Sequence, residues 1–266
     1  MSSINSYGYS PHPLATYLTW VQSIILADPT SLKPFIVSIT ASSPSSLVRM
    51  LDAIQTMRST LNTAALRNRI LVELNTSCPN IDHSPPPSYD FLSLAWTLTI
   101  LTEYFREDPT LTLGLKLPPY VYEAQFEQVI LGVSSLSFTT STGATLNPIA
   151  FFTSTNTLGS SLLFADQTTA PTTREFAVPS TLGGLAGEPI HPLSLGNVHT
   201  FTRLLAESTD EAMRRIVVIG VGGVTTPEAV VRMRKAGAGI VGCATALGKE
   251  GVAVFEKLAI GLTHGQ

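Results

Sequence analysis

The sequence has few cysteines, and it has no long apolar run. Only two of its 266 residues are cysteine, which excludes a small fold held together by a disulfide framework. No apolar run reaches the length that a transmembrane helix needs, and the N-terminus does not resemble a secretory signal. These absences predict a cytoplasmic protein in a reducing compartment, without a membrane partner.

Charged side chains are also scarce. They make up 13% of the chain, and the formal net charge of −3 comes without any cluster of lysine or arginine. A nucleic-acid-binding surface needs such a cluster, so we expect no nucleic acid partner. Apolar residues make up 44% of the chain, which is enough for a large core. The length suits one α/β domain over residues 1–266.

Six apolar, β-branched segments recur along the chain, usually with a helical pattern between them. Segments that are apolar at nearly every position are typical of strands buried on both faces of a parallel sheet. The expected strands are Pro34–Thr40, Ile70–Ser77, Thr112–Leu117, Ile149–Asn156, Arg215–Gly223 and Gly239–Thr245. The expected helices are Ser45–Arg58, Tyr89–Phe105, Tyr122–Val133, Leu195–Leu205, Pro227–Ala236 and Gly251–Leu262, with a core helix at Leu18–Leu26.

The alternation of strands and helices predicts an α/β fold of the TIM (β/α)8-barrel type. A closed barrel needs eight βα units and the sequence provides about six, so we expect the barrel to be incomplete. Three segments interrupt the pattern. We expect Met1–Ser6 to be the interior of a loop, and Ser134–Pro148 to be a loop or an insertion. Ala165–Pro189 is expected to carry a small hairpin over the barrel mouth.

The segment Glu73–Asn80 is the most informative for chemistry. It closes an apolar strand and then presents amides, hydroxyls and a thiol, at the strand end where barrels place catalytic groups. Cys78 is a candidate proton acceptor, because a thiol titrates close enough to neutrality to provide some thiolate. A structural thiol at a strand end is the alternative. The other cysteine, Cys243, lies within the last apolar strand and is expected in the core.

Polar residues mark the third and fourth expected strands as well. Lys116 is a cation within an otherwise apolar strand, and a buried ammonium needs an anion or an electron-rich ring beside it. A salt bridge to a carboxylate is the alternative. Asn156 and Thr157 end the fourth strand, where an amide and a hydroxyl suit a polar planar ligand, although amides also cap turns.

The last two expected strands end in a pattern typical of phosphate binding. Gly220–Gly223 follows Ile216–Ile219, and Ala244 and Thr245 end the final strand. Barrels often hold a phosphate on backbone N–H groups between the loops after their last two strands. Glycine pairs also occur for packing reasons, but the glycine-rich segment Gly183–Gly187 strengthens the prediction.

In combination, these motifs resemble the dihydroorotate dehydrogenase family, and specifically its soluble class 1A branch, which uses fumarate. The resemblance extends from about Ser3 to Leu258. It rests on Ser3–Ser6 with Gly8, Leu74–Asn80, Lys116–Tyr120, Gly183–Gly187 with Ile190 and Pro192, Ile219–Gly223, and Thr245–Leu247 with Lys249–Gly251. It implies oxidation of dihydroorotate to orotate in pyrimidine (UMP) biosynthesis, with FMN as cofactor and fumarate as acceptor, in a homodimer.

The resemblance also implies roles for individual residues. Cys78 would remove the C5 proton of dihydroorotate while hydride passes from C6 to the flavin. The substrate would be held by Asn5, Gly8, Asn75, Asn80, Asn156 and Thr157. FMN would contact Asn75, Lys116, Thr155, Gly187, Gly222, Gly223, Ala244 and Thr245, with its phosphate at the glycines and its ring near the lysine. No metal ligand set is expected.

The sequence departs from the family pattern at several positions. The family's first two βα units have no counterpart here, Ala244 replaces a usual glycine, and Glu188 stands where a lysine is common. We therefore expect the chain alone to bind FMN weakly and to turn over poorly. Two alternative functions follow from these departures: a catalytically impaired, truncated paralogue or subunit, or a related flavin barrel that acts on another pyrimidine.

Overall fold

The structure is a computed structural model and describes residues 1–6, 10–77, 87–168 and 175–263. At its centre lies a parallel sheet of six strands, in the spatial order β11, β10, β7, β4, β3, β2. The strands are β2 (Phe35–Ile39), β3 (Ile70–Asn75), β4 (Thr112–Leu117), β7 (Ile149–Ser154), β10 (Val217–Val221) and β11 (Ile240–Gly242). Each coincides with one of the expected strands, so this prediction is confirmed.

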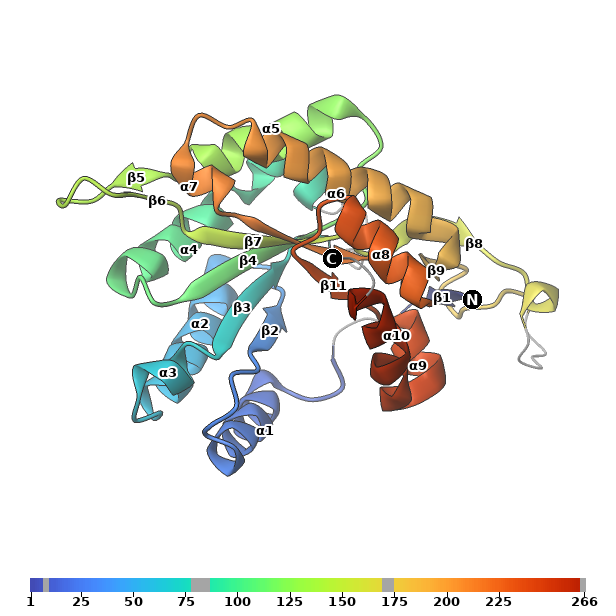
Figure 1. The fold of residues 1–266 in the computed structure, drawn as a ribbon, viewed down its shortest axis with the longest axis horizontal. Coiled ribbons are helices and arrows are strands. Elements are labelled where there is room, and N and C mark those ends of the chain that lie inside the picture. Colours follow the sequence, from blue (N-terminus) through green and yellow to red (C-terminus); the bar gives the residue numbers. More distant parts are fainter. Residues whose placement is uncertain (7–9, 78–86, 169–174, 264–266) are drawn as a thin grey trace.

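Helices connect successive strands and lie around the outer side of the sheet (Figure 1). They are α1 (Leu14–Ala27), α2 (Pro44–Ser59), α3 (Ala64–Arg67), α4 (Ala95–Glu107), α5 (Glu123–Ser134), α6 (His191–Ala206), α7 (Glu211–Arg214), α8 (Pro227–Lys235), α9 (Thr245–Glu250) and α10 (Val254–Thr263). The expected crossover helices are confirmed, with different starting points for α4 and α6. Two 3-10 turns, Pro87–Tyr89 and Phe91–Leu94, precede α4.

The connectivity is that of a TIM barrel that is not closed. Strands that are neighbours in the parallel sheet follow one another along the chain, with helices between them. Within the described residues, β2 and β11 each have a strand neighbour on one side only. The protein is therefore an α/β fold whose curled sheet forms an incomplete TIM barrel, as predicted.

The two faces of this sheet differ in burial. The outer face, which the helices cover, carries Leu115, Leu117 and Phe152, and each of these side chains is fully buried. Along each strand, the residues between those of the outer face point to the inner face. It carries Ile36 and Ile240, which are 40% and 53% exposed because little of the described chain covers them. The apolar core therefore lies between the sheet and its outer helices.

Helix α1 lies at the edge of this core. It was expected at Leu18–Leu26 as a core helix, and it packs on the core with one face only. Leu18 and Ile25 are buried, whereas Trp20, Ile24 and Leu26 are each about half exposed. An apolar composition predicts a helix, but it does not determine how many of its faces other elements cover.

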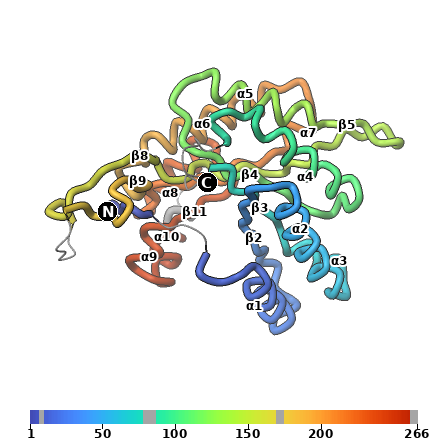
Figure 2. Tube along the Cα trace, turned by 180° about the vertical axis from the view of Figure 1, so that it is seen from behind, coloured from blue at the N-terminus to red at the C-terminus, as the bar shows by residue number. Residues whose placement is uncertain are grey.

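A second, antiparallel sheet corrects two expectations. It contains β1 (Ser2–Asn5), β9 (Leu182–Gly187) and β8 (Leu158–Leu162), in the order β1, β9, β8. The N-terminal segment is thus a strand and not a loop interior. The expected hairpin at Ala165–Pro189 is not formed by β9, whose partner β8 precedes that segment; among its described residues, an isolated antiparallel bridge joins Phe176 to Phe164. Both views show β1 beside β9, on the side of α9 and α10 (Figures 1 and 2).

The segment Ser134–Pro148, expected as a loop or an insertion, holds a short antiparallel hairpin. Its strands are β5 (Phe138–Thr139) and β6 (Thr145–Leu146). Asn147 fixes the base of this hairpin by donating from Nδ2 to the carbonyl of Val133 at 2.8 Å. The hairpin extends away from the parallel sheet (Figure 1).

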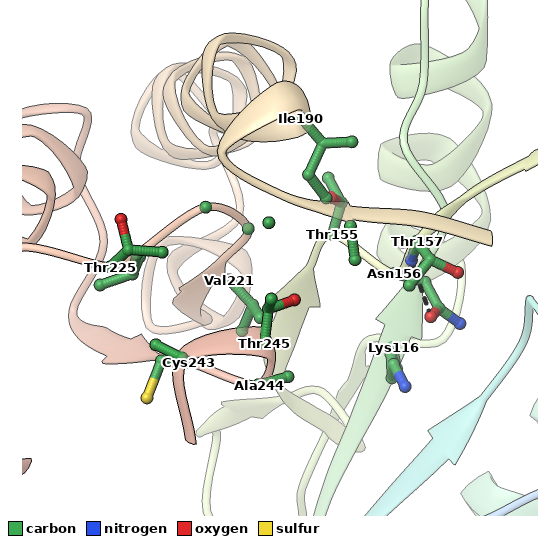
Figure 3. Close-up of a pocket in the computed structure, with 16 residues that line it drawn as sticks. Lys116, Thr155, Asn156, Thr157, Ile190, Val221, Thr225, Cys243, Ala244 and Thr245 are labelled. Atoms are coloured by element: carbon green, nitrogen blue, oxygen red, sulfur yellow. Dashed lines mark hydrogen bonds between the residues drawn. The ribbon is translucent and has the colours of Figure 1, made fainter. Parts of the chain in front are cut away.

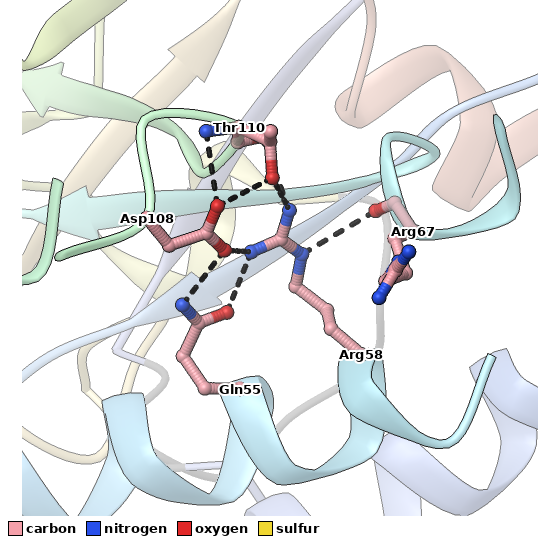
Figure 4. A network of polar contacts seen from close by, with 5 residues as sticks. All are labelled: Gln55, Arg58, Arg67, Asp108 and Thr110. Atoms are coloured by element: carbon pink, nitrogen blue, oxygen red, sulfur yellow. Dashed lines mark hydrogen bonds and ion pairs between the residues drawn. The ribbon is translucent and has the colours of Figure 1, made fainter. Parts of the chain in front are cut away.

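A buried arginine joins α2 to the loop before β4 (Figure 4). Arg58 is 2% exposed and donates to Asp108 Oδ2 at 2.6 Å and to the carbonyl of Thr110 at 3.1 Å. Gln55 Nε2 donates to the same carboxylate at 3.0 Å. Burial alone would raise the pKa of Asp108, but hydrogen bonds from Thr110, Gln55 and Arg58 lower it to about 2. The carboxylate thus stays ionised opposite the guanidinium until the pH falls toward that value.

Replacing Arg58 with alanine should lower the free energy of unfolding by about 3 kcal/mol, because it leaves Asp108 without its cation and empties a buried site. Urea unfolding at neutral pH measures this loss. The matched control is Arg203→Ala, which breaks the exposed α6 pair with Glu207 and should cost less than about 0.5 kcal/mol. Equal losses in the two variants would contradict the structural role given to Arg58.

Candidate active site

A cavity lies at the C-terminal end of the parallel strands (Figure 3). Strands β4, β7, β10 and β11 all point toward it, and the segments that follow them form its walls. Its lining residues are Lys116, Thr155, Asn156, Thr157, Ala186, Gly187, Ile190, Val221, Gly222, Gly223, Val224, Thr225, Cys243, Ala244, Thr245 and Ala246. Most residues singled out in the sequence for cofactor contact thus meet in one place, where barrel folds carry their active sites.

One end of the cavity is formed by the glycine pair after β10. Gly222 and Gly223 have φ values of +132° and +66°, which favour glycine. A Cβ at Gly222 would lie 1.9 Å from Ser194 Oγ, and one at Gly223 would lie 2.5 Å from His191 Cβ. No hydrogen bond from the backbone N–H of either glycine occurs among the described residues. The pair therefore provides a backbone surface with free donors, which is what a phosphate group needs.

The opposite wall of this end comes from the start of α9. Ala244 and Thr245 line the cavity, and Thr245 Oγ1 lies 2.8 Å from Ser3 Oγ on β1. Cys243 was expected in the core, but it is only partly buried and also lines the cavity. Burial raises the pKa of the Cys243 thiol, so this group stays protonated at neutral pH.

Lys116 lies on the same side of the cavity as Asn156 and Thr157 (Figure 3). It is partly buried and stands opposite Asn75 in the parallel sheet. Within the described parts of the chain, its ammonium forms neither a salt bridge nor a hydrogen bond. The alternative of a carboxylate partner is therefore not found there, and the charge is available to a ligand.

Asn156 lines the amide end of the cavity, and Asn75 and Ser77, which do not line it, hold the Asn156 side chain. Asn156 Nδ2 donates to Ser77 Oγ at 2.7 Å and to Asn75 Oδ1 at 3.3 Å. The backbone N–H of Ser77 also donates to Asn75 Oδ1, at 3.2 Å. These contacts use the oxygen of Asn75, so its Nδ2 is left as a donor for a ligand. Thr157 stands next to this cluster, and its Oγ1 lies where a Cβ at Gly184 would be.

Some predicted site residues lie elsewhere. Asn5 does not line the cavity; it donates from Nδ2 to the carbonyl of Gly184 at 3.3 Å, within the antiparallel sheet. Gly8, Cys78 and Asn80 lie outside the described residues, so their roles stay predictions.

Two buried polar residues were not recognised from the sequence. Ser77 is 5% exposed and fixes both asparagine amides, and its only sequence signal is its place two residues after Asn75. Glu73 is 6% exposed and accepts hydrogen bonds from Ser38 Oγ at 2.7 Å and from Thr153 Oγ1. It lies on the inner face of the sheet, one side-chain layer below Asn75. A carboxylate within an apolar strand was the signal that could have identified it.

A curled, incomplete α/β barrel with a glycine pair and an amide cluster at its strand ends has the arrangement of the barrel class of enzymes. A sequence profile of the family described as dihydroorotate dehydrogenase matches residues 1–265. Proteins from two strains of Streptococcus pyogenes and one of Streptococcus uberis, provisionally named dihydroorotate dehydrogenase A (fumarate), are 32%, 32% and 31% identical over 258 residues. These matches cover 97% of this chain and 71% of each relative.

The chain therefore belongs to the dihydroorotate dehydrogenase family, and it is an oxidoreductase of that kind. Among the described helices, none has the length and apolar character required to cross a membrane. No group of three or more His, Cys, Asp or Glu side chains in the same residues could hold a metal ion.

Replacing Gly222 with alanine should destabilise the protein by about 1–3 kcal/mol, because φ is +132° and the new Cβ would overlap Ser194 Oγ. Thermal or urea unfolding measures the change. Gly248→Ala is the matched control, since Gly248 lies within α9 with open space around its Cβ position. There the same substitution should stabilise by about 0.5–1 kcal/mol. A change of the same sign in both variants would contradict the tight fit of Gly222.

Proposed function

We propose that this protein oxidises dihydroorotate to orotate with FMN bound in the cavity at the strand ends. The observation that carries the proposal is the presence of three matched features in one cavity. These are the glycine pair Gly222–Gly223 and the ammonium of Lys116, whose N–H groups have no partner among the described residues, and the amide of Asn156, which Asn75 helps to fix. They correspond to a phosphate, an electron-rich ring and a planar amide-bearing substrate.

FMN fits this arrangement by the chemistry of the donors. Its phosphate would lie against the backbone of Gly222 and Gly223, with Ala244 and Thr245 on the other side. Gly187 and Thr155 would complete that end, since both line the cavity. Lys116 would hold its positive charge near the ring. When bound, the flavin supplies the hydride acceptor.

The substrate would lie on the amide side of the cavity. Asn75 Nδ2, Asn156 and Thr157 would bind its ring amides and carboxylate, and Asn5, Gly8 and Asn80 would complete its contacts. Ser77 would keep both asparagine amides in a fixed orientation, which lowers the entropy cost of aligning the ring. Cys78 would act as the general base that removes the C5 proton, because it follows this cluster directly in the chain.

The remaining elements of the proposal rest on family membership. Fumarate would be the electron acceptor, the pathway would be pyrimidine (UMP) biosynthesis, and the working form would be a cytoplasmic homodimer in which residues 1–266 act as one domain. The names of the streptococcal relatives support the choice of fumarate.

A catalytically impaired family member is the second candidate. It is favoured by the exposed inner face of the sheet, where Ile36 and Val217 are each 40% exposed and Ile240 is 53% exposed. In a closed barrel these side chains would be packed in layers. Their exposure is the specific observation that favours weak cofactor binding by this chain alone.

The absorbance spectrum of the purified chain, with and without added FMN, tests the proposal. We expect a bound flavin whose visible band bleaches when dihydroorotate is added without oxygen. Cys78→Ala should retain the flavin band but slow its bleaching by about 10²- to 10⁴-fold, because general-base catalysis contributes that much.

Each outcome separates the candidates. A chain that retains no flavin after incubation with FMN would favour the impaired family member. A flavin that stays oxidised with dihydroorotate but bleaches with another dihydropyrimidine would reassign the substrate. Unchanged bleaching in Cys78→Ala, with equal flavin content, would show that another group is the base.

A further inference from the structure

A buried histidine at the start of α6 lies against the glycine pair of the cavity. His191 is 7% exposed, and its Nδ1 lies 2.8 Å from the carbonyl oxygen of Gly222. Its Nε2 lies 3.1 Å from Nε of Arg232 on α8. Both ring nitrogens are thus occupied by contacts within the protein. Because neither is free to bind a ligand, the effect of His191 on the site must pass through Gly222.

The two partners determine the protonation state of the ring. A carbonyl oxygen only accepts hydrogen bonds, so Nδ1 of His191 must carry a proton to bond with Gly222. The Nε of an arginine only donates, so Nε2 of His191 must present its lone pair to Arg232. The two contacts are therefore satisfied by the tautomer of His191 that carries its proton on Nδ1.

This bond fixes the orientation of one peptide group. In a trans peptide the carbonyl and the next N–H point in opposite directions, so holding the Gly222 carbonyl at His191 turns the N–H of Gly223 away from α6. A peptide between two glycines has no side chain to hinder its rotation and is the easiest kind to reorient. The contact with His191 therefore restrains the rotation of the Gly222–Gly223 peptide group.

The first turn of α6 contacts two of the segments that line the cavity. Ser194, one turn after His191, is fully buried, and its Oγ lies 3.1 Å from Thr155 Oγ1. The turn therefore contacts the segment after β7 through Ser194 and the segment after β10 through His191. Both segments line the cavity.

We propose that His191 is a positioning residue that holds the Gly222–Gly223 peptide in the orientation that presents the Gly223 N–H to the phosphate of a bound phosphate monoester. The inference rests on the proposed function, because FMN is the monoester in question. His191 acts before any ligand arrives, so its contribution is preorganisation of a donor and not a direct contact.

The test compares His191→Ala with His191→Asn in fluorescence titrations with FMN and with riboflavin, which lacks the phosphate. The Nδ2 of asparagine can occupy the position of Nδ1 and donate to Gly222, whereas alanine cannot. We expect His191→Ala to weaken FMN binding about tenfold, the loss of roughly one hydrogen bond. His191→Asn should restore affinity to within about twofold of the original chain, and riboflavin affinity should be equal in all three proteins.

Arg232→Gln provides a second variant at an exposed side chain, where loss of the fold is not expected. It should weaken FMN binding less than His191→Ala does, because the Gly222 bond persists. Nitrogen-15 NMR of the unliganded chain should show the Nδ1–H form of His191. An Nε2–H form, an equal loss for FMN and riboflavin, or unchanged FMN affinity in His191→Ala would each overturn the inference.

Inorganic phosphate separates this inference from the proposed function. If the chain binds no FMN but binds phosphate, and His191→Ala weakens that binding, the inference stands and the proposed function fails. If FMN binds and is reduced by dihydroorotate, but His191→Ala binds it normally, the inference alone fails. If neither FMN nor phosphate binds to the unsubstituted chain, both are wrong.

Discussion

The register of the parallel sheet is the constraint on which the cavity depends. Asn75 stands opposite Lys116, and Lys116 stands opposite Thr153, so three strands present polar side chains at the same height. A slip of one residue between β3 and β4 would turn Lys116 to the outer face, where Leu115 and Leu117 are fully buried under helices. The apolar outer face thus determines which side chains reach the cavity. The same alternation of residues along β4 therefore places apolar side chains in the core and Lys116 at the cavity.

Below that polar layer, Glu73 takes part in the same arrangement. Its carboxylate accepts hydrogen bonds from Ser38 on β2 and from Thr153 on β7. The second bond reaches across β4, which lies between β3 and β7. A buried carboxylate needs such partners, and here they come from separate strands of one face. Glu73 therefore links the strands on the inner face, where Ile36 and Ile240 on the edge strands are left exposed.

The parallel strands could be predicted from the sequence because each is a run of apolar, β-branched residues between polar loops. The antiparallel sheet could not, since β1 reads Ser-Ser-Ile-Asn and β9 is rich in glycine. Its pairing joins Ser2 with Gly187, a contact between distant parts of the chain that no local pattern reveals. Long-range pairing of this kind costs more entropy than local pairing, and local composition carries little information about it.

The same distinction applies to the candidate site. Lys116 was identifiable because a cation within an apolar strand is unusual, and Gly222 and Gly223 were identifiable because they follow one of the last two strands, with Thr245 and a second glycine-rich segment elsewhere. His191 and Ser77 were not, since a histidine at a helix start or a serine in a loop is common. Their significance comes from partners in the folded chain, Gly222 for His191 and Asn156 for Ser77. Sequence patterns can identify an unusual residue in the site. The residues that orient it, such as His191 and Ser77, are recognised only from their contacts in the folded chain.

The antiparallel sheet completes the cavity that the parallel strands begin. Ser3 on β1 meets Thr245 at the start of α9, and Gly187 at the end of β9 lines the same cavity. The carbonyl of Gly187 lies where a Cβ at Gly223 would be, so β9 also limits the residue that can follow β10 there. The requirement for glycine at residue 223 thus comes partly from β9, whose place in the fold its own sequence does not reveal, in addition to the positive φ and the Cβ of His191. A change in how β1 pairs with β9 would consequently alter the glycine end of the cavity without any substitution in β10.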